Sequence, residues 1–214
     1  MWSLFKKIFG QFKNKGSGLD QSVLLPTGVD KLRTEFLAKE ELDGPGGPIS
    51  AREAFELAEE IIVAFDPDAR LTRVTSTGKL ESNGRCTGWS FHFLLPNRWG
   101  YAEFSFTCDR RNEDVQLKLL PFAAAGSALD RMLLEGQAGF VEQQWKVEME
   151  RQPSLTHSFL DSTDVLRRLS AGGKKIDYSL GPVLQAVTPP LGKPRWEVFE
   201  SPAGKKSLYT HSIE

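Results

Sequence analysis

The sequence GWSFHFLLPNRWGYAEFSFTC, residues 88–108, contains two runs in which apolar and polar residues alternate. The apolar positions are Trp89, Phe91, Phe93 and Leu95 in the first run and Ala102, Phe104, Phe106 and Cys108 in the second. A period of two is typical of a strand with one packed face and one wetter face. Because Pro96-Asn97-Arg98 separates the runs and favours a turn, the stretch predicts an antiparallel hairpin.

The sequence before the hairpin predicts a helix over about residues 51–65. Ser50 and Glu53 have the spacing of a capping box, in which each side chain accepts from the other residue's backbone amide. Apolar residues then recur at helical spacing as far as Phe65, and Asp66-Pro67 ends the pattern.

Two further short strands flank the hairpin, over Leu71–Val74 and Val115–Leu119. The dipeptides Thr77-Gly78 and Asn83-Gly84 indicate turns between the first of these strands and the hairpin. Residues 48–121 are therefore expected to form a first unit of α+β class, with one helix packed on about four antiparallel strands.

The same alternation places the two cysteines. Odd-numbered residues of the first hairpin strand and even-numbered residues of the second should face the core. Cys108 is then expected to point inward and Cys86 outward. Residues on opposite faces of a sheet do not meet the geometry of a disulfide, so we expect two free thiols.

Residues 158–214 repeat this order of elements more weakly. The expected elements are a short helix capped at Asp161–Asp164 and strands over Leu184–Thr188, Arg195–Phe199 and Lys206–Ile213. In the first unit 21 residues separate Ser50 from Leu71, and in the second 22 residues separate Ser162 from Leu184. The pattern predicts a second, related unit of about three to four strands. Trp89 and Trp196 occupy matching strands, and we expect both to be core residues.

The N-terminal residues 1–15, MWSLFKKIFGQFKNK, have the pattern of an amphipathic helix. The apolar face consists of Trp2, Phe5, Ile8, Phe9 and Phe12, with Lys6, Lys7 and Lys13 outside it. Residues 1–18 contain four lysines and no acidic residue, so this face could lie on an anionic membrane surface. Alternatively, the face packs on the chain's own core or frays. Residues 15–18, KGSG, are expected to form a hinge.

Two other regions connect these parts. Residues 19–47 are expected to form a second helix, over about residues 29–42, followed by a linker rich in glycine and proline. Residues 122–157 are expected to form a helical connector of one or two helices, with Gly136 and Gly139 as the breaks.

Composition excludes several classes of function. The chain has 214 residues, with 27 Lys and Arg against 28 Asp and Glu, and a nucleic-acid binder usually has a basic excess. Two cysteines and three separated histidines cannot form a Cys-rich zinc site. No nucleophile, phosphate-binding or nucleotide-binding motif occurs, so no catalytic residue, cofactor site or metal ligand is assigned. His92, on the wetter face of its strand, is interpreted as a surface histidine.

The expected location is the cytoplasm. The sequence has no apolar run of 18 residues and no pattern of a signal peptide. If residues 1–15 bind a membrane, the chain is expected at its inner face.

A capped helix with the sequence AREAFELA (51–58), a strand ending LTRVTS (71–76) and the strand WSFHF (89–93) after Gly88 resembles PepSY-like domains. The tandem arrangement is similar to β-lactamase-inhibitor-type folds, in which a helical layer packs on an antiparallel sheet. The resemblance covers about residues 48–121 and more faintly 158–214. It implies a binding or inhibitory role, often outside the cytoplasmic membrane, and supplies no catalytic residues.

The hairpin tip carries Arg98, Trp99 and Tyr101, a composition found at the centres of protein interfaces. These residues are a candidate partner surface, although Trp99 could instead fold back on its own sheet. The main hypothesis is a non-enzymatic binding or scaffold module with a protein partner. The alternatives are a peripheral membrane protein anchored by residues 1–15 and an enzyme whose site is not visible in the sequence. The sequence indicates neither a ligand nor an oligomeric state.

Overall fold

A computed structural model describes residues 36–42, 47–108, 113–124, 126–155, 159–189, 192–202 and 207–212. These residues have an α+β fold. The helices are α2 (Ala51–Phe65), α3 (Ala128–Leu134), α4 (Ala138–Arg151) and α5 (Ser162–Ala171), with short 3-10 turns at Pro96–Arg98 and Tyr178–Leu180. The strands are β1 (Phe36–Leu42), β2 (Arg70–Ser76), β3 (Gly88–Leu95), β4 (Gly100–Cys108), β5 (Glu113–Pro121), β6 (Val183–Val187), β7 (Arg195–Phe199) and β8 (Ser207–Ser212).

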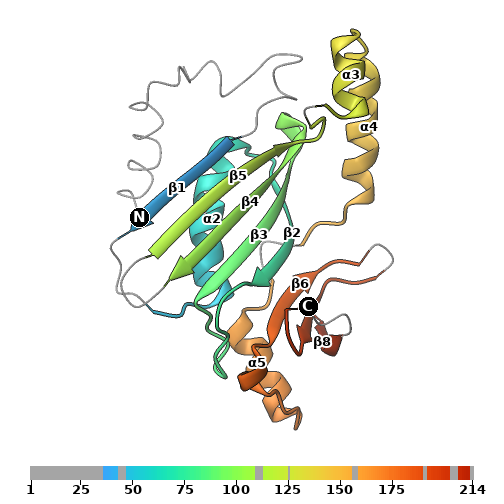
Figure 1. The fold of residues 1–214 in the computed structure, drawn as a ribbon. Coiled ribbons are helices and arrows are strands. Elements are labelled where there is room, and N and C mark those ends of the chain that lie inside the picture. The colour runs from blue at the N-terminus through green and yellow to red at the C-terminus, as the bar shows by residue number, and fades with distance from the viewer. Residues whose placement is uncertain are drawn as a thin grey trace.

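All eight strands of the described residues belong to one antiparallel sheet (Figure 1), in the order β1-β5-β4-β3-β2-β6-β7-β8. The predicted hairpin is confirmed as β3 and β4. Gly88 is opposite Thr107 at the open end of the hairpin, and Leu95 is opposite Gly100 at its tip. β2 and β6 pair over three residues, including Arg73 with Val187. The strands after α5 therefore extend the same sheet.

Helices α2 and α5 cover one face of this sheet, and α2 lies behind it in Figure 1. The capping box of α2 is confirmed, because Ser50 accepts from the Glu53 amide and the Glu53 side chain accepts from the Ser50 amide. The buried face of α2 packs on β3, with the Phe55 and Phe91 rings 5.9 Å apart. Val165 of α5 is buried in the same hydrophobic core. The opposite face of the sheet, which these helices leave uncovered, is called the open face below.

Trp89 and Trp196 are both fully buried, as predicted. The Trp89 indole donates to the carbonyl of Ile49, at 3.0 Å, and Ile49 precedes the N-cap residue of α2. The Trp196 indole donates to the carbonyl of Leu160, at 2.8 Å, and Leu160 precedes the N-cap residue of α5. Each tryptophan thus joins the sheet to the start of one covering helix.

The N-termini of these two helices also contact each other. The amide of Ala51 donates to Ser162 Oγ, and the amide of Arg52 donates to Asp161 Oδ1, both at 2.9 Å. The Arg52 guanidinium lies over the Phe159 ring, 4.3 Å from its centre. Amides of the first turn of α2 are therefore satisfied by side chains at the start of α5.

The prediction of a helix over residues 29–42 is wrong for Phe36–Leu42, which form β1; residues 29–35 lie outside the described residues. Apolar residues at spacings of three and four favoured a helix, as did the good helix formers that follow them. In the structure β1 pairs with β5 along its whole length. Phe36 is opposite Leu119 at one end, and Leu42 is opposite Glu113 at the other. Pairing with a distant strand has overridden local helix propensity.

The prediction that Cys86 points outward is also wrong, because the Cys86 side chain is fully buried. It does not belong to β3, which begins at Gly88, but lies in the preceding loop. There it forms isolated bridges with Ile49 and Leu80. The alternation of a strand cannot be extended into a loop, which explains the error. The side chain of Cys108 lies outside the described residues.

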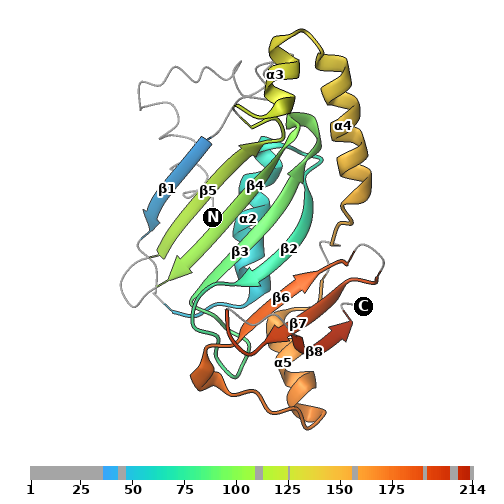
Figure 2. The ribbon, with the colours of Figure 1, turned by 45° about the vertical axis from the view of Figure 1, so that its right-hand side comes forward.

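The connector, predicted as one or two helices, forms two, α3 and α4. The predicted break at Gly139 is wrong, because Gly139 lies in the first turn of α4. Gly136 separates them with a φ of +81°, a backbone conformation that glycine adopts without strain. The hairpin of α3 and α4 projects beyond the end of the sheet in Figure 2. It has a small core of its own, formed by Ala123, Leu133 and Val141.

Candidate functional site

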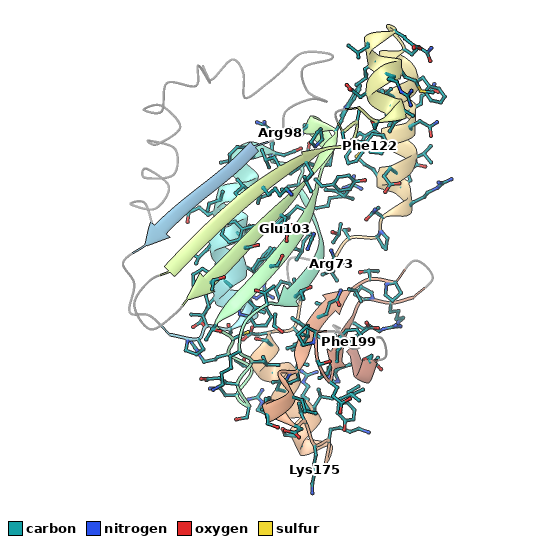
Figure 3. All side chains as sticks on the ribbon, viewed as in Figure 1. Arg73, Arg98, Glu103, Phe122, Lys175 and Phe199 are labelled. Atoms are coloured by element: carbon teal, nitrogen blue, oxygen red, sulfur yellow. The ribbon has the colours of Figure 1, made fainter. Side chains whose placement is uncertain are left out.

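A groove of about 560 Å³ lies between the open face and the C-terminal end of α4. Strands β2 to β6 supply its floor, and residues of the segment 148–153 supply one wall. Figure 3 labels two residues of the open face, Arg73 and Glu103, on the side of the sheet turned away from α2. Ligand pockets have volumes of about 300–1,000 Å³. The groove can therefore hold a small molecule or a few residues of a peptide.

A β-bulge in β2 places Arg73 on the open face. Leu71 and Val74 are both fully buried although they are three residues apart, so strict alternation fails between them. Leu71 is opposite Phe93 of β3, but Arg73, two residues later, is opposite His92. Bulges re-aim the side chains that follow them. Without this one, Arg73 would face the core together with Leu71.

Arg73, His92 and Glu103 form a row across β2, β3 and β4, because directly opposed residues of antiparallel strands share a face. Arg73 Nη2 lies 3.1 Å from His92 Nε2 and 3.3 Å from Nδ1. His92 Nε2 lies 3.9 Å from Glu103 Oε1. The predicted surface histidine is thus a half-buried member of a polar cluster at the groove.

Burial lowers the pKa of His92 and the nearby Arg73 lowers it further, whereas Glu103 raises it. Neutral His92 is therefore favoured in the folded protein. On acidification, His92 is protonated in the unfolded chain first, at a pH of about 6.5. The free energy of unfolding should therefore fall as the pH drops through this value, and should continue to fall until His92 is protonated in the folded protein too.

We expect His92→Gln, which does not titrate, to lose less stability than the wild type between about pH 7.5 and pH 5. Urea unfolding of both proteins at the two pH values measures the difference. An identical pH dependence for both proteins would contradict this account of His92.

Ser90, His92 and Glu103 lie together but not in the order of a catalytic triad. In a triad the imidazole accepts from the hydroxyl, and its other nitrogen is held by the carboxylate. Here Ser90 Oγ donates to Glu103 Oε1 at 3.1 Å and lies 3.5 Å from His92 Nε2, so hydroxyl and carboxylate approach the same nitrogen. This geometry holds the side chains in place without preparing Ser90 as a nucleophile. Within the described residues, no group of three His, Cys, Asp or Glu side chains could hold a metal ion.

The wall of the groove is fixed by contacts between α4 and the hairpin of β3 and β4. The Trp145 indole donates to the Pro96 carbonyl at 3.3 Å, and its ring meets the Tyr101 ring edge-on at 5.5 Å. The Tyr101 hydroxyl donates to Glu148 Oε1 at 3.2 Å. Burial raises the pKa of Tyr101, and the charge of Glu148 and this hydrogen bond raise it further, so the hydroxyl remains a donor.

The segment after α4 is tied to the floor of the groove. The amide of Leu155 donates to the Leu71 carbonyl at 2.7 Å, beside the bulge in β2. Thr188 Oγ1, which follows β6, donates to the Ser154 carbonyl at 3.4 Å. With α4 held at one end and residues 154–155 at the other, the groove is formed before any ligand binds.

The predicted partner residues diverge. Arg98 donates to the Phe65 carbonyl at 2.7 Å and lies over the Phe65 ring, at the end of α2. Trp99 has a left-handed backbone, with a φ of +47°, and packs half-buried beside Phe122 on the small core of α3 and α4. Figure 3 labels Arg98 and Phe122 at this end of the sheet. Of the three residues, Tyr101 alone lines the groove, and the Trp99 surface remains a prediction.

The predicted membrane face, Trp2 to Lys13, lies outside the described residues, so membrane anchoring also remains a prediction. Among the helices that the structure describes, none is long and apolar enough to cross a membrane.

Sequence reasoning missed most of the groove. The spacing of three between Leu71 and Val74, both apolar in a predicted strand, was a usable signal of the bulge. Nothing in the local pattern indicated that α4 would pack on the open face.

Comparison of the chain with protein-family models, with curated proteins and with solved structures gave no significant match.

Proposed function

We propose that this protein is a binding module that holds a segment of a protein partner in the groove between the open face and α4. The observation that carries the proposal is the preformed groove itself, with a floor of paired strands and a wall held at both ends. A preformed site lowers the entropy that must be lost on binding.

The lining favours a peptide over a purely apolar ligand. Val187 and Leu120 supply apolar surface, whereas Gln185 and Gln152 supply amide groups that can pair with a peptide backbone. β2 and β6 are paired with neighbours on both sides. The partner would therefore be held by side chains, and not by addition of a strand to the sheet.

We further propose that the chain consists of two related units, each a helix packed on antiparallel strands, as the resemblance to PepSY-like and β-lactamase-inhibitor-type folds implies. Support comes from the matching hydrogen bonds of Trp89 and Trp196, each of which reaches the carbonyl before a helix N-cap. β2 and β6, the first strands of the two units, pair antiparallel at the junction. The groove lies over this junction, because both strands contribute to its floor.

A selection from displayed random peptides tests the binding function. We expect the wild-type chain to enrich a set of peptides and Val187→Trp, which fills the groove from β6, to lose them. Glu56→Trp adds the same side chain on the exposed surface of α2 and should retain them.

Unfolding curves establish that the variants are folded, and Thr188→Trp replaces Val187→Trp if the latter is not. Failure of the wild type to enrich any peptide, or enrichment that both groove variants retain, would contradict the proposed function.

A further inference from the structure

We infer that the partner segment is acidic and that Arg73 and Arg151 bind its carboxylates. The inference rests on the proposed function. The two arginines approach the groove from different elements, Arg73 from β2 and Arg151 from the last turn of α4. Arg–carboxylate pairs are among the strongest charge-assisted hydrogen bonds, and clusters of arginine are a common means of recognising acidic motifs.

Arg73 is available for such a contact. Its side chain is exposed, and its polar partner is the imidazole of His92. Because the pKa of His92 is lowered, this partner is neutral near pH 7 and does not balance the guanidinium charge. Glu103, the nearest acid in the row, is already engaged by Ser90. In the part of the chain that the structure describes, Arg73 forms no ion pair.

Arg151 is available in the same way. It is exposed at the end of α4 and forms no ion pair with any described residue. Glu148, one turn earlier, is the acid that also lines the groove. The Glu148 Oε1 atom accepts from the Tyr101 hydroxyl at 3.2 Å and from Gln152 Nε2 at 2.7 Å. Glu148 is therefore hydrogen-bonded to two neutral groups and not paired with an arginine of the groove.

The lining therefore contains two arginines without an acidic partner and one glutamate. Some arginines outside the groove have acidic partners, such as Arg167 with Asp164 at 2.6 Å and Arg85 with Glu53 at 2.9 Å, whereas the exposed Arg131 forms no ion pair with a described residue. Arg73 and Arg151 differ from such surface arginines because both line one groove, and this convergence favours a ligand that supplies carboxylates to both of them. The overall charge of −1 argues against a polyanion such as nucleic acid, which requires a broad basic surface.

The test repeats the peptide selection with the full chain and with Arg73→Gln/Arg151→Gln. Peptides enriched by the wild type should be rich in Asp and Glu, and this bias should disappear in the double variant. For one enriched acidic peptide, each single substitution should weaken binding about tenfold, and added salt should reduce the difference. Arg131→Gln/Arg167→Gln removes the same charge from exposed positions outside the groove and should keep both the bias and the affinity.

The possible outcomes separate the two proposals. The selected peptides could be lost in Val187→Trp, and so depend on the groove, yet show no acidic bias. That result would overturn this inference and leave the binding function intact. Acidic peptides that bind the Arg73→Gln/Arg151→Gln protein as well as the wild type would also overturn it. The absence of any groove-dependent peptide would instead overturn the binding function.

Discussion

Replacement of Trp196 by alanine is expected to destabilise the protein by about 3–5 kcal/mol, the usual cost of removing a buried Trp or Phe side chain. Trp196 is fully buried, meets the Phe159 ring edge-on at 6.0 Å and donates to the Leu160 carbonyl. The loss is a large fraction of a typical stability of about 5–15 kcal/mol. Urea unfolding followed by far-UV circular dichroism measures it, and Phe140→Ala on the exposed face of α4 serves as the control.

Trp196→Phe separates packing from hydrogen bonding. Phenylalanine keeps a large ring but leaves the Leu160 carbonyl without its donor, which should cost about 1–3 kcal/mol. Because residues of α2, α5 and strands from both ends of the sheet contribute to one core, each variant should still unfold in a single transition at a lower urea concentration. A second transition, with residues 47–124 unaffected, would show that residues 159–212 fold independently of them.

Replacement of Gly84 by alanine is expected to cost about 2–4 kcal/mol, from backbone strain and overpacking together. Gly84 lies in the predicted Asn83-Gly84 turn with a φ of +88°, a backbone conformation that residues with a side chain rarely adopt. A Cβ atom at this position would lie 2.5 Å from the Ser162 carbonyl oxygen and 2.6 Å from Thr163 Cα, both backbone atoms at the start of α5. The loop around Gly84 could then no longer pack on the start of α5.

Gly173→Ala is the matched control, because Gly173 also has a positive φ, of +73°, but a Cβ atom added there would meet no described atom within 4 Å. Gly173→Ala should show only the cost of placing alanine in the left-handed region, about 1–2 kcal/mol. Thermal or urea unfolding of the two variants gives the difference. Equal losses for both would contradict the close packing of the loop against α5.

Local patterns predicted the elements whose faces are set by their own sequence. The alternation in residues 88–108 predicted the strands of the hairpin, and the capping box at Ser50 predicted the start of α2. Gly136 marked the break between α3 and α4. In each case the residues that give the signal are close to one another along the chain, so periodicity and capping were sufficient.

Features that depend on distant partners could not be predicted in this way. Residues 36–42 have good helix formers, yet they pair with β5, about eighty residues later in the chain. Arg73 faces the groove because of a bulge, and the wall of the groove depends on contacts such as Tyr101 with Glu148. The candidate site is made almost entirely of such contacts, which explains why the sequence indicated the hairpin tip instead.

The most direct test of groove binding is hydrogen exchange of the full chain with and without the peptide most enriched in the selection. We predict that protection on binding is concentrated at the C-terminal end of α4, in the middle of β2 and at the end of β6, near Arg151, Arg73 and Val187. Protection confined to the hairpin tip around Trp99, or to the edge strand β8, would contradict the groove as the binding site.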